Sequence, residues 1–122
     1  MIVKKHYSPN FSKKIRKNKE IKLIVIHYTG MQSVIESIKR LSSLKHKVSC
    51  HYLIDRRGKV LKMIDENRVA WHAGKSRWKN FINLNNNSIG IELVNKGHEF
   101  GYEKFTNLQI KELIKICLEL KK

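Results

Sequence analysis

The sequence predicts an α/β domain in which a mixed central β-sheet is flanked by helices. Two apolar runs rich in β-branched residues, 21–28 and 88–94, have the composition of buried central strands. Apolar residues recur at helical spacing over 33–45 and 107–121, which supplies helices to pack on the sheet. The chain of 122 residues has the length of one domain, and no apolar run reaches the ~18 residues that would span a bilayer.

The N-terminal third begins with a polar, basic segment. Residues 1–20 predict a basic arm that packs through Tyr7 and Phe11 and leads into the domain formed by residues 21–122. The run 21–28 is the first strand of that domain, and an amphipathic helix over 33–45 follows it.

A β-hairpin is predicted in the middle of the chain. Its strands are residues 49–55 and 59–64, and Gly58 stands in the turn where a positive φ is wanted. Residues 66–87 are rich in Asn, Trp and Gly and predict a long loop before the strand at 88–94.

The C-terminal helix has a clear start signal. Thr106 is a favourable N-cap for a helix over 107–121, which follows a polar loop at 95–105. The apolar face of this helix consists of Leu108, Ile110, Leu113, Ile114, Cys117, Leu118 and Leu120.

Two polar side chains stand out because each belongs to an apolar strand. His27 lies at the C-terminal end of the first strand, where open α/β sheets place ligand groups, and a neutral imidazole is a good zinc ligand. Glu92 interrupts the strand at 88–94, and a carboxylate there is costly unless it is paired or functional, for instance as a general base. The alternatives are a histidine that only caps its strand and a glutamate that faces solvent from a one-sided sheet.

Two further pairs of residues could form part of a site. Trp71 and His72 lie in the predicted loop, and an aromatic ring beside an imidazole suits sugar or peptide binding, although a tryptophan that only plugs the core is the alternative. Cys50 and His51 are neighbours on a strand, so their side chains point to opposite faces. A packed thiol and a buried, hydrogen-bonded histidine are therefore favoured over a nucleophile pair.

Composition restricts the cellular context. Cys50 and Cys117 have no CxxC spacing, which favours two reduced thiols. The segment after Met1 lacks the apolar stretch of a signal peptide, which favours a cytoplasmic location.

The net charge of +16 would attract polyanions such as nucleic acid, anionic lipid or acidic cell-wall polymers. The excess of Lys over Arg and the abundance of Asn and Ile are equally typical of AT-rich coding, and this compositional explanation is preferred. No nucleic-acid-binding motif accompanies the charge, so nucleic acid is not favoured as a partner.

The ordered motifs closely resemble those of the zinc-dependent N-acetylmuramoyl-L-alanine amidases. This family includes the bacterial recycling amidase, the phage T7-type lysozyme and the peptidoglycan recognition proteins, and the chain looks most like the recycling branch. Each motif is weak alone, but the ordered set is specific and extends over nearly the whole chain. The matching segments are 8–11, 24–31, 48–55, 70–74 and 88–95.

The resemblance implies a hydrolase that cleaves the amide between N-acetylmuramic acid and L-alanine in peptidoglycan or muropeptides, with a zinc ion that polarises the attacking water. By the same resemblance, His27 matches the first zinc ligand, and Glu92 matches the carboxylate that orients or deprotonates the water. Trp71 and His72 match the loop that borders the substrate groove.

One departure from the family bears on activity. The family takes its second and third zinc ligands, and a lysine that stabilises the oxyanion, from a segment after the last helix, and no segment of this sequence matches it. We therefore expect a C-terminally incomplete domain, a zinc site of low occupancy, and weak or no activity of the chain alone. A separately encoded C-terminal piece is then a candidate partner. The alternatives are a non-catalytic muropeptide-binding module and, second, a basic nucleic-acid-binding protein.

Overall fold

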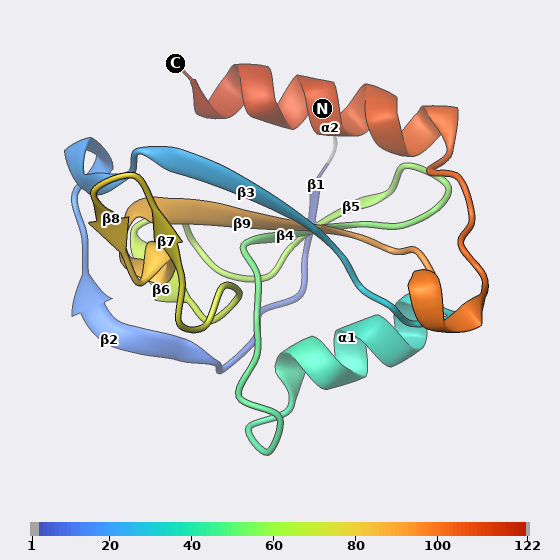
Figure 1. Ribbon diagram of the computed structural model, residues 1–122, viewed down its shortest axis with the longest axis horizontal. Coiled ribbons are helices and arrows are strands. Elements are labelled where there is room, and N and C mark those ends of the chain that lie inside the picture. The colour runs from blue at the N-terminus through green and yellow to red at the C-terminus, as the bar shows by residue number, and fades with distance from the viewer. Residues whose placement is uncertain (1–2, 122) are drawn as a thin grey trace.

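A computed structural model, which describes residues 3–121, has a five-stranded mixed sheet between two helices (Figure 1). Within this sheet one adjacent pair of strands is antiparallel and the other three pairs are parallel. This arrangement confirms the predicted fold class. The strand order is β1 (Val3–Lys5), β5 (Val60–Lys62), β4 (Tyr52–Ile54), β9 (Ser88–Leu93) and β3 (Leu23–Tyr28).

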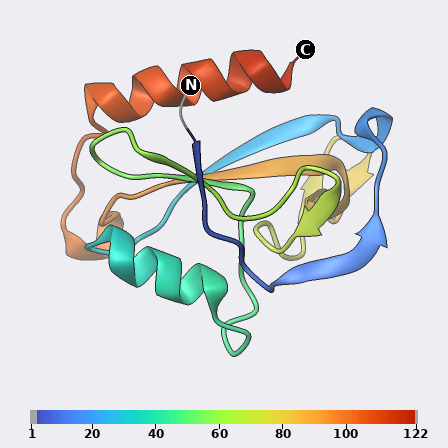
Figure 2. The same cartoon turned by 180° about the vertical axis from the view of Figure 1, so that it is seen from behind.

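The two helices cover opposite faces of the sheet, as the front and back views show (Figure 2). One face packs on α1 (Val34–Ser42), where Leu41 meets Leu53 of β4. The other face packs on α2 (Asn107–Leu120), where Ile116 meets Ile54 of the same strand. Successive side chains of a strand point to opposite faces, so β4 contributes to both cores. None of the helices within residues 3–121 combines the length and apolar character needed to cross a membrane.

Capping residues explain where the helices begin. Ser33 accepts a hydrogen bond from the backbone N–H of Glu36 at 3.1 Å and starts α1. Thr106 and Gln109 form a capping box at the start of α2, as the sequence predicted for Thr106. Gln109 is fully buried and donates to the carbonyls of Ile54 and Val94, which attaches α2 to the ends of two strands.

Residues 66–87, predicted to be a loop, contain regular structure. Strand β6 (Arg68–Ala70) pairs with β2 (Phe11–Ile15), and β7 (Arg77–Trp78) forms a hairpin with β8 (Phe81–Ile82). These strands have two or three residues each, except β2, so they are too short to show alternation in the sequence. The remaining short elements are the 3-10 turns η1 (Asn18–Glu20), η2 (Leu84–Asn87) and η3 (His98–Phe100).

The N-terminal segment is held by polar anchors. Asn10 is fully buried and donates to the carbonyls of Ser43 and Val48 at 2.8 and 2.9 Å, and Ser8 donates to the carbonyl of Leu41. Tyr7 is 53% exposed, contrary to the expected packing, whereas Phe11 is 36% exposed and its ring lies 5.3 Å from the guanidinium of Arg68. The two strands β1 and β2 make this segment part of two sheets, while a domain boundary at residue 20 stays a prediction.

Candidate active site

His27 and Glu92 lie side by side on one face of the sheet. Their Cα atoms are register partners on the parallel strands β3 and β9, and Glu92 is also the partner of Leu53 on β4. Partners in adjacent strands point to the same face, and Leu53 packs toward α1. The two predicted site residues therefore share the α1-facing side of the sheet.

His72 reaches this face from the segment after β6. Its Nδ1 lies 3.0 Å from Nε2 of His27, and the two rings meet edge to face with centroids 5.2 Å apart. The ring rests on Gly90 of β9, where an added Cβ would lie only 2.4 Å from Cγ of His72. A glycine at position 90 is thus required for the two histidines to meet.

Both ring nitrogens of His72 have partners inside the protein. Nε2 lies 2.9 Å from Oγ of Ser88, opposite the nitrogen that meets His27. The backbone N–H of His72 donates to Oδ1 of Asn85 at 3.0 Å, which holds the loop in place. Burial lowers the pKa of His72 to about 3 and also lowers the pKa of His27, so both rings are neutral at pH 7. Both ring nitrogens of His72 are therefore engaged within the protein, and contact of this residue with substrate stays a prediction.

Trp71 is partly buried and is tied to neighbouring segments by its donors. Its indole N–H donates to Oγ of Ser12 at 3.0 Å, and its backbone N–H donates to Oγ of Ser49 at 2.8 Å. The indole therefore helps to attach β2 to the loop that carries His72. A role for its exposed part in substrate binding stays a prediction.

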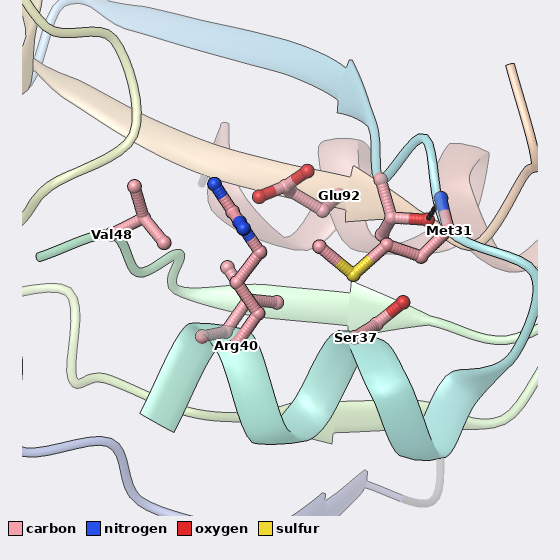
Figure 3. Close-up of a pocket in the computed structure, with 7 residues that line it drawn as sticks. Met31, Ser37, Arg40, Val48 and Glu92 are labelled. Atoms are coloured by element: carbon pink, nitrogen blue, oxygen red, sulfur yellow. Dashed lines mark hydrogen bonds between the residues drawn. The ribbon is translucent and has the colours of Figure 1, made fainter. Parts of the chain in front are cut away.

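Glu92 lines a small pocket between the sheet and α1 (Figure 3). Within residues 3–121 its carboxylate forms no ion pair or hydrogen bond, although Arg40 points toward it from α1. Burial raises the pKa of Glu92 to about 7, and the positive charge of Arg40 opposes the rise. Glu92 thus faces a pocket and not open solvent, with a proton affinity suited to a general base. The cavity of about 100 Å³ is lined by Thr29, Met31, Ser37, Arg40, Leu41, Val48 and Glu92.

A second cavity adjoins the first and adds positive charge. The two share Thr29, Met31 and Arg40. The second cavity, of about 360 Å³, is also lined by Tyr28, Gly30, Lys96, His98 and Glu99. Its cationic side chains suit a ligand with carboxylate groups.

Arg16 is a supporting residue that the sequence analysis missed. Its side chain is 3% exposed and donates to the backbone carbonyls of Glu66, Asn85, Asn86 and Ser88. Its guanidinium also lies 3.2 Å from Nε2 of His51. Arg16 therefore joins both ends of the segment that carries His72. No local signal distinguishes this arginine from the other basic residues of the first twenty positions.

The expectations for His51 and Cys50 are confirmed. His51 is fully buried, its Nδ1 accepts from the backbone N–H of Gly90 at 3.0 Å, and its Nε2 lies 2.8 Å from the carbonyl oxygen of Arg68. Burial lowers the pKa of His51 to about 4. Cys50 packs in the core beside α1, and Cys50 and Cys117 are both free thiols.

The metal-binding capacity of the described residues is limited. No group of three or more His, Cys, Asp or Glu side chains within residues 3–121 is arranged to hold a metal ion. His27 and His72, whose facing nitrogens lie 3.0 Å apart, are together fewer than the three protein ligands of such a site. This donor set does not fit a three-ligand catalytic zinc site.

Comparison with characterised proteins agrees with the motifs. Residues 17–122 match the family described as N-acetylmuramoyl-L-alanine amidase. The chain is 33% identical over 112 residues to the amidase AmiD of Escherichia coli, a match that covers 82% of this chain and 40% of AmiD. It is 29% identical to the 1,6-anhydro-N-acetylmuramyl-L-alanine amidase AmpD of Haemophilus influenzae, covering 89% of this chain and 72% of AmpD.

Solved structures show the same fold. AmpDH3 of Pseudomonas aeruginosa superposes with a TM-score of 0.77 at 27% identity, covering 90% of this chain and 47% of that one. E. coli AmiD in complex with the substrate anhydro-N-acetylmuramic acid-L-Ala-D-gamma-Glu-L-Lys superposes with a TM-score of 0.74 at 30% identity, covering 89% and 45%. By its motifs, its fold and the match over residues 17–122, the chain belongs to the N-acetylmuramoyl-L-alanine amidase family.

Proposed function

We propose that this chain acts on the amide between N-acetylmuramic acid and L-alanine in peptidoglycan or muropeptides. The main support for the proposal is the position of Glu92. Its carboxyl lines a pocket on the same face of the sheet as His27 and has a pKa of about 7. The chain spans 40% of one curated relative and 72% of another, so the activity of those proteins is transferred here as a proposal.

The proposed chemistry is general base catalysis by Glu92. Its carboxylate takes a proton from a water molecule as the water oxygen attacks the amide carbonyl. The resulting carboxylic acid then gives the proton to the amine of L-alanine as the C–N bond breaks. A pKa near neutrality lets one group accept and then donate the proton at pH 7.

We propose His27 as the zinc ligand that this chain contributes, as the family resemblance implies. A single imidazole completed by water forfeits most of the stability of a closed site. We therefore expect low zinc occupancy.

The adjoining cavities support a peptide ligand with free carboxylates. The peptide in the E. coli AmiD complex contains a gamma-linked glutamate, which retains its α-carboxylate. We propose that Arg40 and Lys96 attract such a group and that the exposed part of Trp71 borders the sugar. The amide would then lie near Glu92, at the end of the cavities opposite Lys96.

A second candidate function is a muropeptide-binding module without catalysis. The limited metal donor set within residues 3–121 favours it, because the cavities and their cations do not depend on a metal.

One experiment distinguishes the two functions. Release of the alanine-containing peptide from an anhydro-muramyl-tripeptide is measured with and without added zinc, for the wild type, Glu92→Gln and the surface control Glu36→Gln. A cleavage rate that falls at least ~100-fold in Glu92→Gln, while Glu36→Gln cleaves like the wild type, supports the amidase. Saturable binding by calorimetry without cleavage selects the binding module, and the absence of both rejects the two proposals.

A further inference from the structure

We infer that Ser88 and His72 are positioning residues that fix the tautomer of His27, with its proton on Nε2 and a free lone pair on Nδ1. The inference follows from a continuous row of hydrogen bonds. The row runs from the carbonyl of Leu84 through Oγ of Ser88 and both ring nitrogens of His72 to Nε2 of His27.

The direction of the row is set at its buried end. Oγ of Ser88 lies 2.6 Å from the carbonyl oxygen of Leu84, which can only accept, so the hydroxyl proton of Ser88 is used there. Toward His72 the same oxygen must therefore accept, across 2.9 Å. The proton of His72 is thus on Nε2.

The remaining assignments follow one after another. A neutral imidazole carries one proton, so Nδ1 of His72 is an acceptor. Nε2 of His27, 3.0 Å away, must then be the donor. His27 is left with an unprotonated Nδ1, for which residues 3–121 supply no hydrogen-bond donor.

The surroundings hold this order in place. Ser88 is fully buried, so water does not replace its hydroxyl. Gly90 leaves room for the ring of His72, and Asn85 accepts from the backbone N–H groups of His72 and Ala73. A ring turned by 180° would place carbon atoms where both hydrogen bonds now lie, at the expense of two buried bonds.

The consequence is a defined acceptor at the end of β3. The Nδ1 lone pair can bind a proton, a cation or a substrate N–H without any change of tautomer. What this lone pair binds rests on the proposed function, whereas the positions of the protons on His27 and His72 do not depend on it.

The test is the tautomer state of His27, read by long-range ¹H–¹⁵N NMR correlation in the ¹⁵N-labelled chain at neutral pH. The wild type should show the proton on Nε2 in both His27 and His72. In Ser88→Ala, Nε2 of His72 loses its acceptor, so the reversed order becomes competitive. We expect the fraction of His27 with its proton on Nδ1 to rise about tenfold, as the loss of one hydrogen bond of ~1.4 kcal/mol implies.

The matched control is Ser49→Ala. Ser49 is also fully buried, donates to the carbonyl of Asn10 and accepts from the backbone N–H of Trp71, but it does not contact His72. Ser49→Ala should therefore lower the free energy of unfolding about as much as Ser88→Ala does, and it should leave the His27 tautomer unchanged. The ring of His98, whose Nδ1 lies 2.8 Å from the hydroxyl of Tyr28, is the internal reference in every spectrum.

A second variant covers the case in which Ser88→Ala does not fold. His72→Ala removes the acceptor of His27 directly and should also release the Nδ1-protonated form. A proton on Nδ1 of His27 in the wild type, or the wild-type tautomer in both variants, overturns the inference. The spectra need neither substrate nor turnover, so a chain that fails to cleave muropeptide can still pass this test.

Discussion

Gly90 lies directly beneath the imidazole of His72, so close that a Cβ at position 90 would come within 2.4 Å of the ring. The contact couples strand β9, which carries Glu92, to the loop that carries His72. It also affects whether His72 can reach His27, because a side chain at position 90 would displace the ring that contacts both Ser88 and His27.

The first prediction concerns this contact. Gly90→Ala should lower the free energy of unfolding by about 1–3 kcal/mol, because the new methyl group overpacks a held ring. Urea unfolding measures the loss. The same substitution in a His72→Ala background should cost much less, since the obstructing ring is gone. Equal costs in the two backgrounds would show that the ring is not the cause.

The second prediction concerns the pH dependence of stability due to Glu92. Its pKa is about 7 in the folded state and 4.5 in the reference state, so the folded protein binds more protons between these values. Stability from this group is therefore lost as the pH rises from about 4.5 to 7 and changes little above that. Glu92→Gln should gain stability relative to the wild type over this window, by on the order of 1–3 kcal/mol.

Urea unfolding of both proteins from pH 4 to 8 provides the measurement. The lowered pKa values of His51 and His72 also affect stability, but they are common to both proteins and cancel in the difference. A difference that does not vary with pH would show that Glu92 has an ordinary pKa.

The third prediction concerns zinc. After dialysis against a mild chelator the chain should retain well under one equivalent, because one imidazole gives little chelate stabilisation. Elemental analysis of the dialysed protein measures the content, and His27→Ala should reduce any remainder while the surface variant His46→Ala should not. Stoichiometric zinc after dialysis would mean that other residues complete the site.

The fourth prediction concerns Arg16. Arg16→Lys keeps the positive charge but loses the several N–H donors of the guanidinium. Several buried carbonyls are then left without hydrogen-bond partners. We expect a loss of about 2–4 kcal/mol in the free energy of unfolding, together with faster hydrogen exchange in residues 66–88. Arg57→Lys, at an exposed turn, serves as the control and should change stability little. Unaltered exchange in 66–88 would contradict the proposed role.

The sequence by itself determined the elements that have a strong local signal. The apolar runs predicted β3 and β9, helical periodicity predicted α1 and α2, and Thr106 marked the start of α2. The hairpin around Gly58 was also readable, because a positive φ favours glycine, and its φ is 82°. The motifs placed His27 and Glu92 at or near strand ends, and the family match confirms the resemblance that they carry.

Only the tertiary structure decided how the site is built. The short strands β6, β7 and β8 depend on pairing with partners and have no periodicity of their own. The supporting role of Arg16 depends on four backbone carbonyls that are distant in sequence and that the fold brings within hydrogen-bonding distance. The shared face of His27 and Glu92 follows from the register between β3 and β9, and the partners of His72 from the path of its loop. Local preferences determine which segments become helices and strands, whereas side-chain partners come from contacts between distant segments that local sequence does not encode.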